Sequence, residues 1–157
     1  MKGLFISGSG TDIGKTFIAQ HLIGLLTQSR TVAVRKPVES DCTLVDGKLI
    51  TKDASKLIAL SNATDNIDTV CPYRFESCSS AESASKAENI NLSLDHLVKA
   101  CNSNEFVVVE GAGGLLSPMA ENTLNIDLAK ALDLPLVLVV KDELGAINQA
   151  LMTILAA

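Results

Sequence analysis

Gly8-Ser9-Gly10-Thr11-Asp12-Ile13-Gly14-Lys15-Thr16 is the stretch that decides the fold of this chain. It follows an apolar run at residues 3–7 that is typical of a buried strand, and it precedes a helix expected from Phe17 to Leu26. Glycines let the backbone turn with positive φ, so successive N–H groups can point into one concavity at the start of the helix. Lys15 can then reach the outer phosphates of a nucleotide, and the Thr16 hydroxyl can hold Mg²⁺. The sequence therefore predicts a phosphate-binding loop.

The loop is one residue longer than the usual pattern, in which four residues separate a glycine from Gly-Lys-Thr. Here five residues separate Gly8 from Gly14. The alternative interpretation is a glycine-rich turn that binds nothing. The position of Gly-Lys-Thr between an expected strand and an expected helix disfavours that alternative.

The bulk composition narrows the class of protein. With 157 residues and 47% apolar residues, we expect one globular domain with its own core. The net charge of −5 and the lack of a basic patch argue against nucleic acid as the main partner. No apolar run reaches ~18 residues and no signal-peptide pattern is present, so we expect a cytoplasmic protein without a membrane-spanning helix. Four cysteines without a Cys-x-x-Cys motif fit a reducing compartment and disfavour a zinc site.

Apolar runs and helical spacings predict an α/β fold with a mainly parallel sheet between two layers of helices. This is the architecture of a P-loop NTPase-like three-layer domain. Strands are expected near residues 2–8, 31–36, 105–110 and 135–141. Besides the first helix, helices are expected near residues 53–61, 92–101, 124–132 and 144–155. Residues 42–52 are expected to form a loop with a turn at Asp46-Gly47, and residues 62–91 are expected to be irregular.

Two polar candidates follow the second expected strand. Lys36 precedes Pro37, which stops the strand, and ligands of open α/β sheets bind at the carboxyl ends of strands. The residues alone favour a ligand-binding lysine and a surface lysine about equally. Asp53 lies in the first turn of an expected helix, which suits the helix dipole, and a helix-capping role is the simpler explanation for it.

Glu110 ends the clearest strand and leads into Gly111-Ala112-Gly113-Gly114. A carboxylate at such a strand end, facing a phosphate loop, is well placed to bind Mg²⁺ directly or through water. A buried unpaired carboxylate is costly, so a nearby cation is expected. The alternative is a solvated carboxylate, which the flanking glycines disfavour because they indicate backbone held close to another group.

Taken together, four separated motifs give the chain a family resemblance. Behind the long phosphate loop come Lys36-Pro37-Val38-x-Ser40, Asp53, Val109-Glu110-Gly111-Ala112-Gly113-Gly114 and Leu144-Gly145-x-Ile147-Asn148. In this order the chain resembles ATP-dependent dethiobiotin synthetases over its whole length, including the longer loop.

The resemblance implies a reaction in biotin biosynthesis with ATP as co-substrate. CO₂ and ATP close a ureido ring on 7,8-diaminopelargonic acid to give dethiobiotin, ADP and phosphate. The catalytic residues would be Lys15, Lys36 and Thr11, with Thr11 and Ser40 contacting substrate and carbamate. Mg²⁺ would be held by Thr16, Asp53 and Glu110. The nucleotide-binding residues would be Asp12, Ile13, Gly14, Lys15, Thr16, Phe17, Asp53, Glu110, Gly111, Ala112 and Gly113.

The resemblance also implies a homodimer with the substrate site at the subunit interface. In it Leu144, Gly145, Ala146, Ile147 and Asn148 of one subunit receive the substrate carboxylate of the other. A helix start attracts carboxylate, which agrees with this role.

Three features depart from the family pattern. Asp41 stands where a glycine usually follows Ser40, and Ser80-Ala81-Glu82 stands where a Ser-Pro-His run is usual. Family members also continue for several elements after the last expected helix. The chain is therefore expected to be a single dethiobiotin-synthetase-like domain over residues 1–157 that is C-terminally incomplete.

Other functions remain open at this point. One is a related P-loop ATPase, either a partitioning switch or the synthetase domain of a cobyrinic acid amidase. The phosphate loop has no early lysine of the partitioning type, and no glutaminase domain follows. The other is a non-catalytic nucleotide-binding module.

Overall fold

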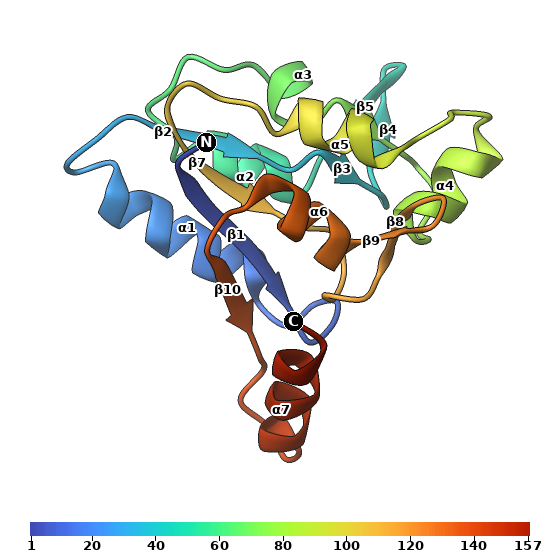
Figure 1. Ribbon diagram of the computed structural model, residues 1–157. Helices are drawn as coiled ribbons and strands as arrows, with labels where there is room; N and C mark the ends of the chain where they lie inside the picture. The colour runs from blue at the N-terminus through green and yellow to red at the C-terminus, as the bar shows by residue number, and fades with distance from the viewer.

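Four parallel strands form the central sheet of the computed structural model, which describes residues 1–157 (Figure 1). Their order in the sheet is β10-β1-β7-β2, and every neighbouring pair is parallel. Their bounds are β1 Gly3–Gly8, β2 Val32–Arg35, β7 Phe106–Glu110 and β10 Leu136–Val139. The predicted parallel α/β sheet and its four strands are confirmed.

The side chains of each strand point alternately to the two faces of the sheet, and two separate hydrophobic cores result. Phe5 and Ile6 are adjacent in β1 and both are fully buried, yet they belong to different hydrophobic clusters. Val107 and Val108 divide in the same way in β7. Successive side chains of a strand point to opposite faces, so a continuous apolar run in the sequence fills both sides of the sheet.

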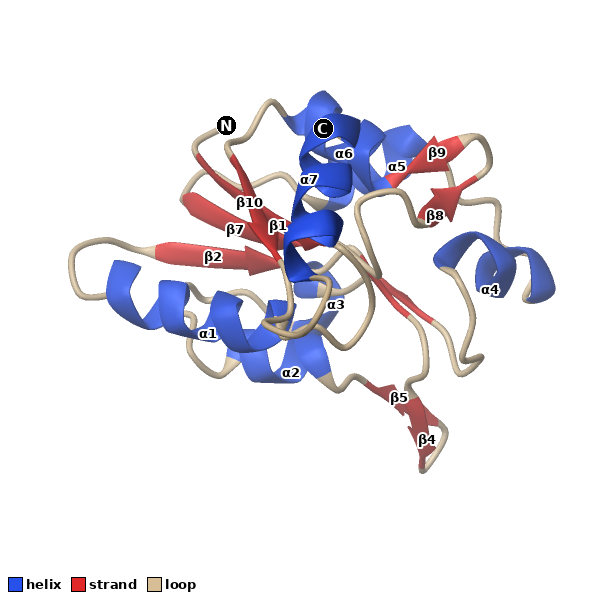
Figure 2. Cartoon of the chain, turned by 90° about the horizontal axis from the view of Figure 1, so that it is seen from below, coloured by secondary structure: helices blue, strands red, loops and turns tan.

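Helices cover both faces of the sheet, as the sequence predicts (Figure 2). Residues of α1 Lys15–Leu26, α2 Asp53–Ile58 and α3 Ile67–Val70 pack in the cluster with Ile6. Residues of α4 Ala81–Ala87, α5 Leu94–Ala100 and α6 Asn125–Leu132 pack in the cluster with Phe5. The last helix, α7 Ala146–Ala156, buries none of its residues and projects from the carboxyl end of the sheet (Figure 1). None of the helices combines the length and hydropathy needed to cross a membrane.

The prediction of a loop at residues 42–52 is wrong, because an antiparallel hairpin occupies this segment. Strands β4 Thr43–Val45 and β5 Lys48–Ile50 pair around Asp46 and Gly47. Both turn residues have positive φ, 49° and 74°, which is the conformation that a two-residue hairpin loop requires.

The prediction of an irregular segment at residues 62–91 is also wrong. It contains α3, α4 and a short strand, β6 Tyr73–Arg74, which pairs in parallel with β3 Val38–Glu39. The side chains of Asn66 and Ser80 accept backbone N–H bonds at the starts of α3 and α4, so these polar residues are helix caps. A further short pair, β8 Pro118–Ala120 and β9 Thr123–Leu124, precedes α6.

Candidate nucleotide-binding site

The phosphate loop connects β1 to α1 at the carboxyl edge of the sheet. Gly14 is the residue before α1 and has φ of 96°, a conformation that L side chains rarely adopt. Lys15 is buried, and its Nζ donates a hydrogen bond to the Gly10 carbonyl oxygen at 2.6 Å. The lysine therefore folds back over its own loop, where its ammonium can meet the phosphates of a nucleotide.

Lys36, Glu110 and Thr16 meet beside this loop. Lys36 Nζ lies 2.7 Å from Glu110 Oε1, and the Thr16 hydroxyl donates to the same oxygen at 3.0 Å. Lys36 is 3% exposed and Glu110 is 0% exposed. These values exclude the alternatives of a surface lysine and a solvated carboxylate.

Asp53 approaches the same ammonium from α2. Its Oδ2 lies 3.8 Å from Lys36 Nζ, and its Oδ1 lies 3.7 Å from Lys56 Nζ. Its position in the first turn of α2 is confirmed, but the predicted helix-capping role is wrong, because the backbone N–H groups of that turn donate to Glu39. Asp53 is thus free to face the site.

The two lysines have opposite pKa shifts. Burial, together with the nearby charge of Lys36, lowers the pKa of Lys15 below its ordinary value of 10.5. Burial by itself would also lower the pKa of Lys36, but the carboxylates of Glu110 and Asp53 outweigh it and raise that pKa. Lys36 therefore stays charged, whereas Lys15 is the more easily deprotonated of the two.

One carboxylate oxygen of Glu110 makes no hydrogen bond. Its Oε2 is buried without any hydrogen-bond partner. A buried carboxylate oxygen without a partner is costly, and a cation beside it would remove that cost. The hydroxyl of Thr16 and the carboxylate of Asp53 lie around the same ammonium-carboxylate pair, so the residues fit a Mg²⁺ ion.

The glycine loop after Glu110 is held by Asn125, a residue that the sequence analysis missed. Asn125 is fully buried, and its Nδ2 donates to the carbonyl oxygens of Ala112 and Gly114 at 2.5 and 2.8 Å. A Cβ on Gly111 would lie 2.5 Å from Asn125 Oδ1, so this close approach requires glycine. No local pattern marks Asn125, because it is a helix residue whose contacts lie outside its own helix.

A cavity of about 570 Å³ opens next to the phosphate loop. Its lining includes seven of the predicted site residues, namely Thr11, Asp12, Lys36, Ser40, Asp53, Ala112 and Gly113. The Ser40 hydroxyl donates to the carbonyl oxygen of Ser79, another residue of the lining, at 2.7 Å. Residues 144–148 do not line this cavity, and Leu144 and Ile147 are exposed.

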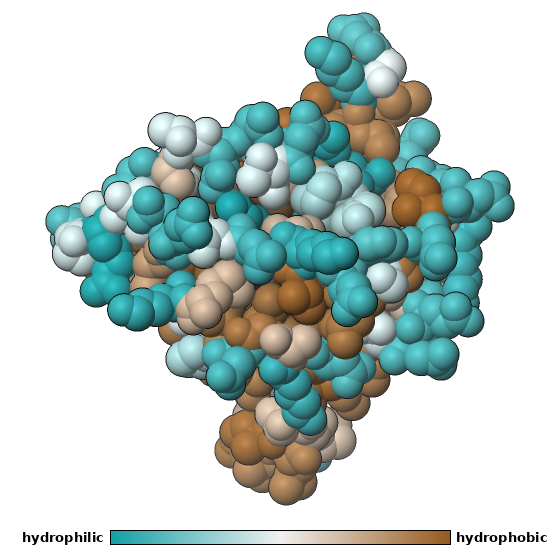
Figure 3. Space-filling view, turned by 45° about the horizontal axis from the view of Figure 1, so that its top comes forward, coloured by the Kyte–Doolittle hydropathy of each residue, from teal (hydrophilic) through white to brown (hydrophobic).

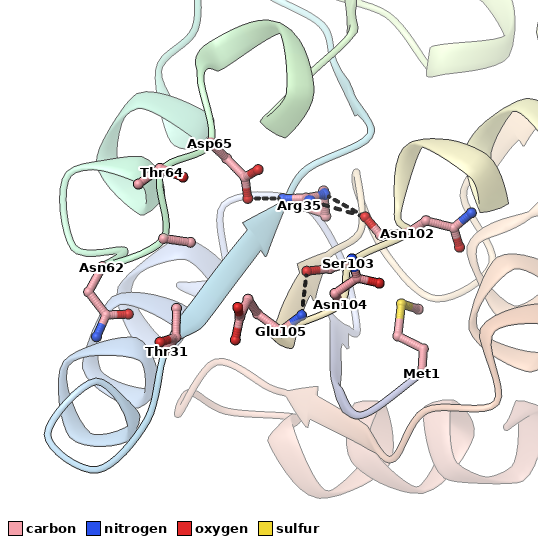
Figure 4. Close-up of a pocket in the computed structure, with 11 residues that line it drawn as sticks. Met1, Thr31, Arg35, Asn62, Thr64, Asp65, Asn102, Ser103, Asn104 and Glu105 are labelled. Carbon is pink, nitrogen blue, oxygen red and sulfur yellow. Dashed lines mark hydrogen bonds and ion pairs between the residues drawn. The ribbon is translucent and has the colours of Figure 1, made fainter.

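A larger cavity, of about 780 Å³, lies beside the edge strand β2 and away from the phosphate loop (Figure 4). Its buried charge is Arg35, which pairs with Asp65 at 2.6 Å and donates to the Asn102 carbonyl oxygen (Figure 4). Because this guanidinium is already partnered from both sides, the cavity has no free buried charge for a ligand. The smaller cavity is therefore the candidate site.

The parallel sheet, the phosphate loop and the acidic strand end define a P-loop nucleotide-binding protein of the α/β class. The model of a family described as an AAA domain matches residues 2–157.

Similarity to curated proteins narrows this class to one family. The ATP-dependent dethiobiotin synthetase BioD of Vesicomyosocius okutanii is 62% identical over 157 residues, which are all of this chain and 73% of the relative. The protein of that name from Ruthia magnifica is 60% identical over 157 residues, which cover 74% of it. The one from Anoxybacillus flavithermus is 33% identical over 160 residues, covering 98% of this chain and 71% of the relative. The chain belongs to the ATP-dependent dethiobiotin synthetases, a family of ATP-dependent ligases of biotin biosynthesis.

Proposed function

We propose that this chain carboxylates 7,8-diaminopelargonic acid with CO₂ and closes the ureido ring of dethiobiotin, with ATP converted to ADP and phosphate. The observation that carries the proposal is the buried Lys36–Glu110 pair beside the phosphate loop, with Glu110 Oε2 unpartnered. This arrangement offers one fixed cation and one site for a second cation at the place where phosphate charge would develop. The names of the relatives support the substrate and product.

The chemistry needs three bond-forming steps. One amine of the diamine attacks CO₂ and loses a proton, which gives a carbamate. A carbamate oxygen attacks the γ-phosphorus and ADP leaves. The second amine then attacks the carbamate carbon, loses a proton and expels phosphate, which closes the ring.

The residues of this chain serve these steps by positioning and by charge. Lys15 would neutralise the transferring phosphoryl group, and Lys36 would face the negative charge on the carbamate and phosphate. Thr11 and Ser40, which line the cavity, would contact substrate and carbamate. Residues 12–17 would surround the phosphates with backbone N–H groups, and Gly111, Ala112 and Gly113 would close the other side.

Thr16, Asp53 and Glu110 would hold Mg²⁺ when it is bound. The ion would neutralise phosphate charge and orient the β- and γ-oxygens. No group of three His, Cys, Asp or Glu side chains could hold a metal alone. That agrees with Mg²⁺, which proteins usually bind through one or two carboxylates together with substrate phosphates.

The proposal includes a homodimer in which residues 144–148 serve the partner's substrate. Leu144 is fully exposed, and the large apolar side chains of α7 are all more than half exposed: Ile147, Leu151, Met152, Ile154 and Leu155. Figure 3 shows this apolar surface at its lower end, over the projecting α7. An exposed apolar patch on one projecting helix is typical of an interaction surface.

Turnover assays test the proposed reaction. ADP release should require both the diamine and bicarbonate, and Lys36→Met should lower it at least about a hundredfold because an oriented charge is lost. Lys99→Ala, an exposed lysine of α5, is the control and should keep full activity. Thermal melts are needed alongside, since breaking a buried ion pair costs about 3–5 kcal/mol.

Each of the other outcomes of the turnover assay would support a different function for this chain. ADP release that ignores the diamine would support a switch-type ATPase, and nucleotide binding without turnover would support a non-catalytic module. Either result overturns the proposed reaction.

A further inference from the structure

Glu39 is a buried carboxylate that the mechanism above leaves without a role. It is 4% exposed and lies at the end of the short strand β3. Its Oε1 accepts the backbone N–H groups of Lys52 and Asp53 at 2.5 and 2.9 Å. Its Oε2 accepts the backbone N–H of Ala54 at 2.9 Å. Both oxygens are therefore bonded to the first turn of α2.

These bonds replace a cap that α2 lacks. The residue before the helix is Lys52, whose side chain makes no capping hydrogen bond. The first N–H groups of a helix have no partner within the helix, and they carry partial positive charge. A carboxylate from elsewhere in the chain satisfies three of them here. Since α2 has only six residues, its start depends on this outside support.

Glu39 also belongs to the segment that carries Lys36. The Lys36 backbone N–H donates to the Val70 carbonyl oxygen at 2.9 Å, and β3 pairs with β6 two residues later. This segment is thus fixed to α3 and β6. Glu39 extends it by hydrogen bonds to the turn that presents Asp53.

We propose that Glu39 is a positioning residue that sets the carboxylate of Asp53 against Lys36 and so completes the Mg²⁺ site. The inference rests on the role of Asp53 in the proposed function. Glu39 acts through the backbone of α2 and not on a ligand, because its two oxygens already accept three N–H bonds. Without it, the polar links of the Asp53 turn to the Lys36 segment would be reduced to the 3.8 Å contact between the Lys36 and Asp53 side chains and the exposed Lys52–Asp41 ion pair.

The test measures Mg²⁺-dependent nucleotide binding and does not depend on turnover. ADP is titrated calorimetrically into the full chain with and without Mg²⁺, for the wild type, Glu39→Ala, Glu39→Gln and Asp53→Asn. Glu39→Ala should weaken binding about tenfold when Mg²⁺ is present and leave metal-free binding unchanged. Glu39→Gln keeps one acceptor oxygen and should lose less. Ser93→Ala, which removes the cap of α5, is the matched control: it should lower the melting temperature and leave Mg²⁺-dependent affinity unchanged.

A double variant distinguishes the possible failures. If Glu39 acts through Asp53, adding Glu39→Ala to Asp53→Asn should cause no further loss of Mg²⁺-dependent affinity. Full additivity of the two losses would overturn the inference, as would wild-type Mg²⁺ dependence in both Glu39 variants. If Asp53→Asn itself binds Mg²⁺ and ADP like the wild type, then the proposed metal role of Asp53 fails instead. Should Glu39→Ala not fold, the comparison of Glu39→Gln with the wild type still decides.

Discussion

Lys15 and Lys36 lie in the same site but are suited to different tasks. Lys36 contacts Glu110 and Asp53, and its raised pKa keeps it charged throughout the range in which proteins are handled. Lys15 has no ion-pair partner, donates to a carbonyl oxygen and has a lowered pKa. One lysine is a fixed positive charge, and the other has a charge that a bound phosphate would stabilise.

Lys15 should make nucleotide binding depend on alkaline pH. Its pKa lies below 10.5 in the free protein, and phosphate oxygens beside it would raise that pKa in the complex. Binding should therefore take up protons, and affinity should fall as pH rises from the lowered pKa of the free protein to the pKa of the complex. Calorimetric ADP titrations between pH 7 and 10, in buffers of different ionisation enthalpy, measure both effects.

Lys15→Arg is the control for this pH dependence. Arginine stays charged over the whole range, so the affinity of this variant should no longer change with pH through this group. Equal pH profiles for the variant and the wild type would assign the effect to another group.

At the scale of the element, sequence patterns predicted long buried segments and missed short ones. The runs that form β1, β7 and β10 are apolar over several residues because two cores are filled from one sheet. The pairs β3–β6 and β8–β9 are only two or three residues long, so no period can develop in them. Their existence depends on contacts between distant segments, which a local pattern does not contain.

The residues of the candidate site likewise fall into those that a local sequence pattern indicates and those that depend on contacts between separate elements. Lys15, Thr16, Lys36 and Glu110 stand at strand ends or in a glycine loop, and the structure brings them together. Asn125 was not predicted, and Glu39 is only the unspecified residue of the Lys36-Pro37-Val38-x-Ser40 motif, because each acts on the backbone of another element. Asp41 is an intermediate case: it stands where glycine is usual, and its φ of 60° shows why glycine suits that position.

Asn125 offers a test of how the glycine loop is held. Asn125→Ala should lower the free energy of unfolding by about 1–3 kcal/mol, because two carbonyl oxygens lose their donor in a buried place. Asn125→Asp should be worse, since an ionised carboxylate donates no hydrogen bond and would face those carbonyl oxygens. Urea unfolding followed by circular dichroism measures both. A larger loss in Asn125→Ala than in Asn125→Asp would contradict the role of the amide as donor.

At the scale of the whole molecule, α7 stands out because its apolar side chains do not pack against the rest of the chain. It touches the phosphate loop through one hydrogen bond, from the Ser9 hydroxyl to Gln149 Oε1 at 3.2 Å. Its apolar side chains otherwise face outward. A helix in this state needs a second surface, and the proposed homodimer supplies one.

Sedimentation velocity tests the dimer. The wild type should sediment with twice the chain mass, and Leu151→Glu combined with Leu155→Glu should shift it to the monomer, because charges would enter an apolar contact. Leu25→Glu, at a leucine of α1 whose exposure of 64% lies between those of Leu151 and Leu155, is the control and should remain dimeric. A monomeric wild type, or a dimer in all three proteins, would exclude α7 as the interface.

The pairing of β1 with β10 also determines how late the central sheet can be completed during synthesis of the chain. Phe5 pairs with Leu136 and Gly8 with Val139, so β1 waits for a neighbour that is made more than a hundred residues later. At a synthesis rate of roughly 5–20 residues per second, that wait is on the order of ten seconds. The other neighbour of β1 is β7, which is formed by Phe106–Glu110, so both sides of β1 stay unpaired for most of that wait. The strand that leads into the phosphate loop is therefore held on both sides only after residues 136–139 have been made.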